Sequence, residues 1–230
     1  QGESNTKRAL EYTTMMKYLI KDWRTKWDMG NLPFYYVQLF NMGITGNTLY
    51  EEGNWQDTRY QQLELLNENI DNIGMVVSID TNEDPDNPDA MIRIHPKNKK
   101  PIGHRLALLS RELCYSEAII GTSPFPKRNY VRNDTVFVVF SDVGTGLKTL
   151  DNDVLKGFVI ADNSRNFKSG AGTILNDSTV IVKSAEVSDP VAVRYAWAKN
   201  PSCNLANSED LPASPFKTDD WLSLYDYSDF

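Results

Sequence analysis

The residues best suited to acid–base chemistry in this 230-residue chain are its two histidines, His95 and His104. Histidine is a common general base because its ordinary pKa lies close to neutral pH. His95 stands directly before Pro96, between an acidic segment and a predicted helix. His104 lies off the apolar stripe of that helix, which predicts a solvated side chain. A lone histidine in a loop is more often structural, so the residues around His95 decide its interpretation.

Two carboxylates precede His95 and are candidates to orient it. Asp80 directly follows an apolar run that predicts a buried strand, and Asp89 lies in the loop that follows. An aspartate beside a histidine fixes the tautomer of the imidazole and stabilises its protonated form. We rank Asp80 above Asp89, because a residue at a strand end is held more firmly than one in a proline-containing loop. A histidine steadied by a backbone carbonyl alone is the third alternative.

The same acidic segment imitates the beginning of a calcium-binding loop. Aspartate or asparagine occupies every second position from 80 to 86. The position that needs glycine holds Pro85, however, and the position that needs glutamate holds Met91. The pattern therefore predicts a solvated acidic loop, with no metal site.

The first half of the chain predicts alternating helices and strands that would carry these side chains. Apolar residues recur at helical spacing over 6–27, 55–70 and 96 or 97 to 115, and short β-rich runs cover 34–39 and 74–79. This order is typical of a parallel sheet flanked by helices. Sites in such sheets form at the carboxyl ends of the strands, which is where we expect Asp80 and His95.

The second half predicts a different architecture. Short alternating runs separated by Gly, Asn, Asp and Pro cover 136–140, 157–160, 179–182 and 191–197. Such spacing is typical of an antiparallel β-sandwich. We place the boundary at residues 122–124, which divides the chain into an α/β part, 1–122, and a β-sandwich domain, 123–230.

Composition narrows the class of partner. The net charge is −7, which argues against nucleic acid and anionic membranes, and no apolar run approaches the length of a membrane span. Cys114 and Cys203 could form one disulfide, although two buried free thiols are favoured. The chain starts at Gln1, without Met or a signal peptide, so we expect it to begin inside a longer protein.

Three tryptophans are candidates for stacking on sugar rings. Trp23 and Trp27 lie on the apolar face of the first predicted helix, so we expect them in the core. Trp55 opens the second predicted helix and is the remaining candidate.

Several strings in the chain resemble those of the sialate O-acetylesterase family of SGNH hydrolases. The string around His95, Ile94–Lys99 followed by Gly103, Arg105 and Leu106, resembles the one that holds the catalytic histidine in that family. The resemblance extends from residue 1 to 221, and its other strings are Gln1–Asn5, Asp22–Arg24, Pro33–Leu39, Arg59 with Gln62, Pro190–Trp197 and Leu211–Trp221.

The resemblance implies serine-dependent hydrolysis of O-acetyl esters on sugars, either sialic acids or plant glycans such as xylan. His95 would be the general base, and the Gly2 N–H and the Asn5 side chain would stabilise the oxyanion. The alternative for residues 2–5 is a simple helix N-cap formed by Ser4 or Asn5. No cofactor or metal is implied, and the family resemblance points to a secreted or periplasmic protein. The implied substrate-pocket candidates are Gln1, Glu3, Arg59 and Arg93.

Two departures from the family pattern qualify this prediction. The Gly-Gln-Ser-Asn string that carries the nucleophile in the family is absent. As a nucleophile, Ser4 would have to replace an oxyanion-hole position. SGNH enzymes commonly place an aspartate two or three residues before the histidine, where this chain has Arg93 and Ile92. We therefore expect the nucleophile in an N-terminal half of the same enzyme, and an isolated chain that is inactive. The rival hypothesis is a non-catalytic, glycan-binding remnant.

Overall fold

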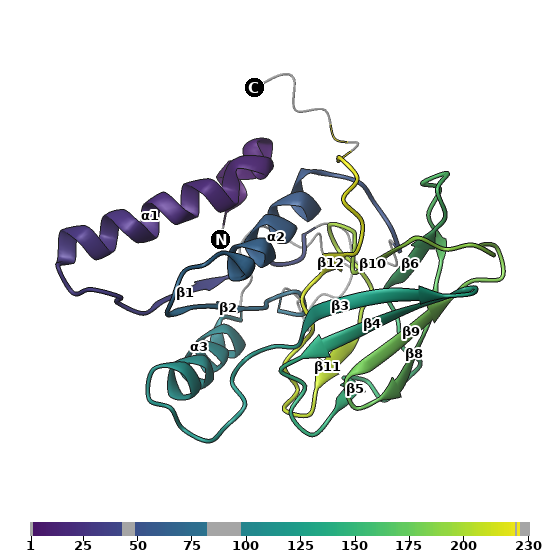
Figure 1. Cartoon of the computed structure of the whole chain (residues 1–230). Coiled ribbons are helices and arrows are strands. Elements are labelled where there is room, and N and C mark those ends of the chain that lie inside the picture. Colours follow the sequence, from purple (N-terminus) through teal and green to yellow (C-terminus); the bar gives the residue numbers. More distant parts are fainter. Residues whose placement is uncertain (1, 43–48, 82–97, 224, 226–230) are drawn as a thin grey trace.

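The computed structural model describes residues 2–42, 49–81, 98–223 and 225 of the chain (Figure 1). Residues 2–121, the α/β region, contain the helices and one parallel pair of strands. Residues 122–223, the β region, contain antiparallel strands. The protein is thus mixed α/β, with few helices and several antiparallel sheets. No described helix has the length and apolar character needed to cross a membrane.

The α/β region keeps the predicted order of helices and strands but shortens most of them. Its elements are η1 (Glu3–Glu11), α1 (Tyr12–Trp27), β1 (Phe34–Val37), α2 (Asn54–Glu64), η2 (Leu65–Asn67), β2 (Ile73–Val76) and α3 (Lys100–Leu113). The first predicted helix is a 3-10 helix followed by an α-helix, with non-helical dihedral angles at Arg8. It ends where Asp28 adopts the left-handed conformation, φ 51°, two residues before Gly30.

The two strands of this region are parallel neighbours. Phe34 pairs with Ile73 and Val37 pairs with Val76. Helices α1 and α2 lie on one side of the pair and α3 lies on the other (Figure 1). The layered arrangement agrees with the predicted alternation, whereas an SGNH-type sheet with further strands stays a prediction.

The β region contains two four-stranded antiparallel sheets and one antiparallel pair. The strand orders are β3-β4-β9-β8, β12-β10-β6-β7 and β11-β5. The strands are β3 (Phe125–Arg132), β4 (Thr135–Ser141), β5 (Leu147–Thr149), β6 (Phe158–Ala161), β7 (Lys168–Ser169), β8 (Ala171–Asn176), β9 (Thr179–Lys183), β10 (Ala192–Tyr195), β11 (Leu205–Asn207) and β12 (Phe216–Lys217). The four predicted runs fall on β4, β6, β9 and β10, and the sequence analysis missed the other six strands.

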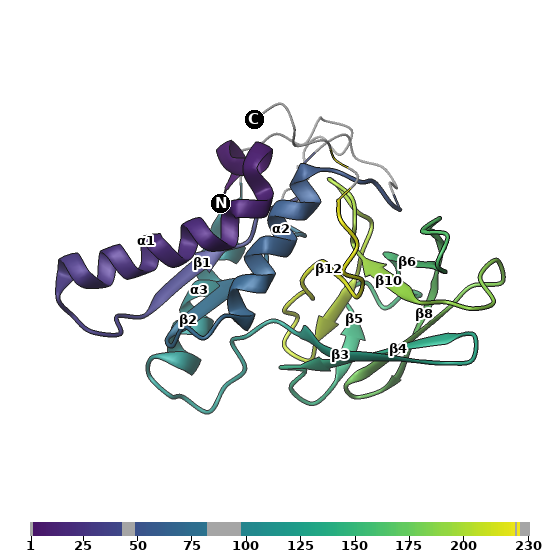
Figure 2. The ribbon, with the colours of Figure 1, turned by 45° about the horizontal axis from the view of Figure 1, so that its top comes forward.

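The two regions meet without a break in the hydrophobic core. One cluster of buried apolar residues contains Met75 of β2 as well as Phe140 and Phe216 of the β region. The regions lie against each other in both ribbon views (Figures 1 and 2). The predicted domain boundary at 122–124 coincides with the start of the β region, but the division into two domains stays a prediction.

The join itself is tightly packed at Gly121. A Cβ atom at this position would lie 2.3 Å from the carbonyl oxygen of Leu108 in α3, so only glycine fits without a shift of the backbone. The Gly121 N–H donates to the carboxylate of Glu112 at 3.0 Å, and the Thr122 hydroxyl donates to the same oxygen at 2.5 Å.

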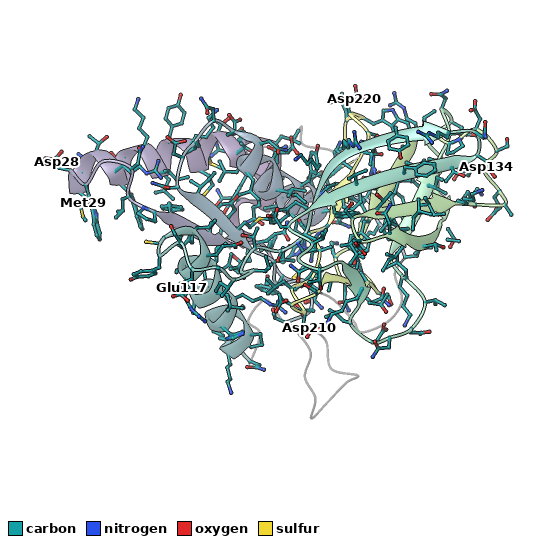
Figure 3. The ribbon with its side chains drawn as sticks, turned by 60° about the horizontal axis from the view of Figure 1, so that its bottom comes forward. Asp28, Met29, Glu117, Asp134, Asp210 and Asp220 are labelled. Atoms are coloured by element: carbon teal, nitrogen blue, oxygen red, sulfur yellow. The ribbon has the colours of Figure 1, made fainter. Side chains whose placement is uncertain are left out.

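Helix α1 leaves much of its apolar face uncovered. Tyr12, Met16 and Ile20 are buried, whereas Trp23 is 46% exposed and Trp27 is 62% exposed. The expectation that both tryptophans lie in the core is therefore wrong for this chain. Trp23 meets one edge-on neighbour, Phe34, at a centroid distance of 5.6 Å. The helix is followed by Asp28 and Met29, which Figure 3 shows at one end of the molecule.

Candidate functional site

Part of the predicted site lies outside the described residues. His95, Asp89, Arg93 and Gln1 belong to this group, so their predicted roles stay predictions. The described part of the predicted site consists of Asp80, residues 2–5 and Arg59. Arg59 contacts the segment after β1, of which residues 38–42 and 49–53 are described. His104, which was not expected to be the general base, is exposed on α3 as predicted.

Asp80 lies beyond the carboxyl end of β2, where the sequence places it, and it is held by Arg105. The Arg105 guanidinium donates to both carboxylate oxygens, at 2.7 and 2.6 Å, and also to the carbonyl of Val77 at 2.9 Å. Such bidentate pairs are among the stronger charge-assisted hydrogen bonds. The Asp80 side chain is 30% exposed, and a carboxylate can accept more than two hydrogen bonds. A further contact from His95 to Asp80 is a prediction that the described residues do not test.

The sequence analysis missed the role of Arg105, although it quoted the residue as part of the family string. The signal was available in the apolar stripe of the helix, because Arg105 stands beside Leu106 and four residues before buried Leu109. A buried charged residue on the inner side of a helix needs a partner of opposite charge. Asp80 is that partner.

Residues 2–5 form the start of η1. The Gly2 N–H donates to the carboxylate of Glu3 at 2.9 Å, and the Gly2 carbonyl accepts from the Asn5 N–H at 2.8 Å. No side chain caps η1, so the N-cap interpretation of Ser4 or Asn5 is wrong. A Cβ atom on residue 2 would lie 2.7 Å from the ring of Tyr12, which explains a glycine here. The oxyanion role of Gly2 and Asn5 and the pocket role of Glu3 stay predictions.

Arg59 has no exposed surface in the part of the chain that the structure describes, and its role as a substrate-pocket candidate stays a prediction. Its side chain is completely buried, and its guanidinium donates only to backbone carbonyls among the described residues. The acceptors are Leu39 at 2.9 Å, Phe40 at 2.6 Å, Ala198 at 2.7 Å and Lys199 at 2.8 Å. Burial lowers the pKa of Arg59 to about 9, so the group remains charged at neutral pH. Arg59 thus joins the segment after β1 to the β region.

The segment after β1 is also anchored by the β region at both of its ends. The Met42 N–H donates to the carbonyl of Lys199 at 2.9 Å, and the Glu51 N–H donates to the carbonyl of Trp197 at 2.8 Å. The Asn41 side chain donates to that of Asn200 at 2.8 Å. Because this segment leaves the carboxyl end of β1, it borders the edge where sites form in parallel sheets.

Trp55 does not offer a surface for sugar stacking. Only 4% of it is exposed, and its indole N–H donates to the carbonyl of Phe40 at 2.8 Å. Its ring contacts that of Phe40 edge-on, with the centroids 6.2 Å apart. Trp55 therefore belongs to the support of the segment after β1.

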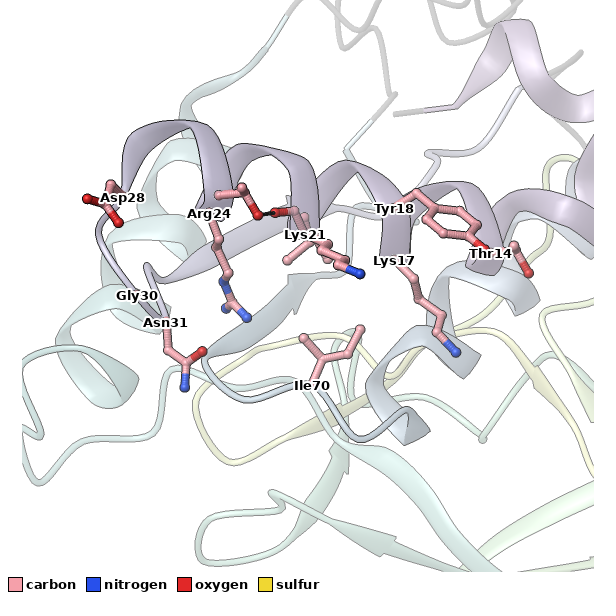
Figure 4. A pocket seen from close by; sticks show the side chains of 11 residues that line it. Thr14, Lys17, Tyr18, Lys21, Arg24, Asp28, Gly30, Asn31 and Ile70 are labelled. Atoms are coloured by element: carbon pink, nitrogen blue, oxygen red, sulfur yellow. Dashed lines mark hydrogen bonds between the residues drawn. The ribbon is translucent and has the colours of Figure 1, made fainter.

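A groove of about 660 Å³ runs along α1 (Figure 4). Its cationic side chains include Lys17, Lys21 and Arg24, and none of the predicted catalytic residues lines it. Lys17 pairs with Glu68 at 2.7 Å, and Arg24 donates to the carbonyls of Leu32 and Asp71. These contacts connect α1 to neighbouring loops, so the groove does not indicate a catalytic centre.

The thiols of Cys114 and Cys203 are free, which agrees with the favoured prediction. Cys114 is exposed, however, and Cys203 is only partly buried, so the prediction that both thiols are buried is wrong. Burial raises the pKa of the Cys203 thiol to about 12. Among the described residues, no group of three or more histidine, cysteine, aspartate or glutamate side chains is placed to hold a metal ion.

Residues 1–110 match the family model of "Carbohydrate esterase, sialic acid-specific acetylesterase". These residues belong to the sialate O-acetylesterase family. Over 94% of the chain, the sequence is 28% identical to the sialate O-acetylesterase of Mus musculus and 27% identical to that of Rattus norvegicus. The chain spans 42% of the length of each relative.

A solved structure extends the family match beyond residue 110. The crystal structure of a carbohydrate acetylesterase from Xanthomonas citri superposes on 96% of this chain with a TM-score of 0.84 and 35% sequence identity. The superposition covers 49% of that acetylesterase chain. The sialate O-acetylesterase resemblance therefore includes the β region as well as the α/β region.

Proposed function

We propose that the complete protein is a serine-dependent carbohydrate O-acetylesterase and that this chain supplies its general base. The observation that carries the proposal is the 35% identity to a carbohydrate acetylesterase across 96% of the chain. The substrate would be an O-acetylated sugar, either a sialic acid or a plant glycan. A secreted or periplasmic location is part of the same proposal.

In this mechanism His95 removes the proton from a serine hydroxyl supplied by the N-terminal half of the enzyme. The serine oxygen attacks the acetyl carbonyl, and the oxyanion accepts hydrogen bonds from the Gly2 N–H and the Asn5 amide. Protonated His95 then gives its proton to the sugar oxygen as the bond from that oxygen to the acetyl carbon breaks, so the sugar leaves as an alcohol and the serine is acetylated. Water, deprotonated by His95, releases acetate and restores the serine.

The open surface of the α/β region supports a nucleophile supplied from outside this chain. A parallel sheet is normally covered on both faces and extends beyond two strands, yet only β1 and β2 are present among the described residues. The exposed apolar side chains of α1, including Leu19, Trp23 and Trp27, lie on the same region. A further part of the same protein that packs here would extend the sheet and cover this face.

The test compares the isolated chain with the chain co-folded with its N-terminal half. We expect p-nitrophenyl acetate hydrolysis only from the complete enzyme. In that enzyme His95→Ala should remove most of the activity, because an unassisted serine hydroxyl is a poor nucleophile, and His104→Ala should change little. Equal effects of the two substitutions would contradict the assignment of His95. Activity of the isolated chain that is lost in Ser4→Ala would contradict the assignment of the nucleophile.

The rival function is a glycan-binding protein without catalysis. The observation that favours it is the absence of a Gly-Gln-Ser-Asn string from the 230 residues. A full-length reading frame that also lacks this string, together with glycan binding and no ester hydrolysis, would establish the rival.

A further inference from the structure

A pocket of about 410 Å³ lies at the junction between the α/β region and the β region. Its lining comes from the last two turns of α2, from η2, and from β3, β4 and β12 with adjoining residues. Helix α2 contacts β12 at this junction, and both ribbon views show the two elements side by side (Figures 1 and 2). The pocket is large enough for a small ligand, because sites for small molecules commonly measure about 300–1,000 Å³.

The lining of this pocket is cationic, although the net charge of the protein is −7. Lys127, Arg128 and Lys217 line it, and Glu64 is the carboxylate residue among the described residues that do so. Lys217 is partly neutralised by Asp219, which lies 3.8 Å from its ammonium group. The two cations of β3 therefore set the sign of the charge that the pocket offers to a ligand.

Lys127 and Arg128 are both exposed, and neither side chain forms a hydrogen bond or an ion pair with a described residue. The pairing of β3 with β4 shifts its register between Pro126 and Arg128, so Lys127 has no partner residue in β4. Shifts of this kind change the direction of side chains and are common beside binding sites. Both cations are thus available to a ligand in the pocket.

Uncharged polar groups also line the pocket. The side chains of Asn129 and Ser141 make no hydrogen bond with a described residue, whereas the Asn67 amide donates to Glu64 at 3.1 Å. Amides and hydroxyls can pair with the hydroxyl groups of a sugar, and cations pair with a carboxylate through stronger, charge-assisted hydrogen bonds. The two kinds of group together fit a sugar that carries a carboxylate.

We propose that this pocket binds an acidic sugar unit, with the carboxylate of the sugar at Lys127 and Arg128. The choice of a sugar as the ligand rests on the proposed esterase function. None of the residues assigned to ester hydrolysis lines the pocket among the residues that the structure describes. The site would therefore raise the affinity for acidic glycans without taking part in the cleavage.

The test measures binding of methyl β-D-glucuronide to the full-length protein by isothermal titration calorimetry. This sugar carries no acetyl ester, so its binding does not depend on hydrolysis. Methyl β-D-glucoside is the matched neutral ligand, because it has the same ring without the carboxylate. We expect the glucoside to bind at least about tenfold more weakly, because it lacks the charge-assisted hydrogen bonds. Inorganic phosphate, an anion without a sugar ring, should also bind more weakly than the glucuronide.

Three variants and one control connect the binding to this pocket. Lys127→Met and Arg128→Met should each lower the affinity for the glucuronide by about three- to tenfold. Glu64→Gln should raise it by about threefold, because this change removes a like charge from the lining. The control is Lys183→Met, which removes an exposed cation of the same sheet, paired with Asp134 at 3.2 Å, and should leave the affinity unchanged.

Four outcomes would overturn the inference. They are no binding of the glucuronide, equally tight binding of the glucoside, equally tight binding of phosphate, and an unchanged affinity in Lys127→Met and Arg128→Met. A protein that binds the glucuronide at this pocket but hydrolyses no acetyl ester would refute the proposed function and leave the site in place. Hydrolysis of acetyl esters without glucuronide binding would refute the site alone.

Discussion

The β region and the α/β region bury their apolar residues to different degrees. In the β region, Val138, Ile160, Val180 and Phe216 are completely buried between the strands. In the α/β region, helix α1 follows an equally regular apolar pattern but leaves half of that face open. The difference shows that periodicity identifies which residues share a face, whereas burial depends on whether that face has a partner.

The largest expected difference between the regions is the cost of removing one aromatic side chain from each. Phe216→Ala should lower the free energy of unfolding of this chain by about 3–5 kcal/mol, because it opens a cavity among Phe140, Phe158 and Tyr195. Trp23→Ala should cost less than about 1 kcal/mol in the isolated chain, since the indole is already half exposed. Urea denaturation of both variants measures the two values.

The same pair of variants sharpens the comparison in the full-length protein. If another part of the protein covers α1, Trp23→Ala should become several times more destabilising there than in the isolated chain. An equal, small effect in both forms would show that this face stays open.

A second prediction concerns the connection between the regions. Arg59→Met should destabilise the chain by about 3 kcal/mol, because it leaves buried carbonyl oxygens of both regions without a donor. The control is Arg8→Met, which removes an exposed pair with Glu11 and should change stability by less than about 0.5 kcal/mol. Similar effects in thermal denaturation would argue against Arg59 as the link.

A smaller effect is expected at the edge of the parallel strands. Arg105→Met should cost about 2 kcal/mol, because it leaves the partly buried Asp80 carboxylate and the Val77 carbonyl unpaired. Arg111→Met on the same helix is the control, since its pair with Glu117 is exposed. If Arg105→Met is as mild as the control, Asp80 is not held by this pair.

The smallest expected effect is a difference in reactivity between the two cysteine thiols. At pH 8 a thiol with a pKa of about 12 is ionised to the order of one part in ten thousand, so native Cys203 should barely react with Ellman's reagent. Exposed Cys114 should react readily, and unfolding should release the second thiol. Reactivity of Cys203 should rise with pH, because its raised pKa favours the neutral form below that value. Equal rates for both thiols in the folded chain would contradict this environment.

Much of the fold could be predicted from local patterns. The helices follow apolar periodicity, both parallel strands follow short β-rich runs, and Asp80 lies where the sequence places it, beyond the carboxyl end of β2. Strand β3 escaped prediction because its residues are largely polar and exposed, and its pairing with β4 contains a register shift between Pro126 and Arg128. The segment becomes a strand because it pairs with β4, and the pattern of its own residues gives no information about that pairing.

The site was less predictable because its contacts join residues that are far apart in the sequence. Arg59 was a pocket candidate because it belongs, with Gln62, to a string that resembles the family. Its acceptors Ala198 and Lys199 are 139 and 140 positions away, so no local signal reveals them.

The close packing of Gly121 against α3 has a consequence for the length of the chain at the join. The backbone passes within contact distance of Leu108, and Glu112 holds both Gly121 and Thr122. An inserted or deleted residue here would displace β3, because this strand begins shortly after the join. Insertions and deletions should therefore be tolerated in the turns of the β region, such as the one at Asp134 in Figure 3. At the join between the two regions they should not be tolerated.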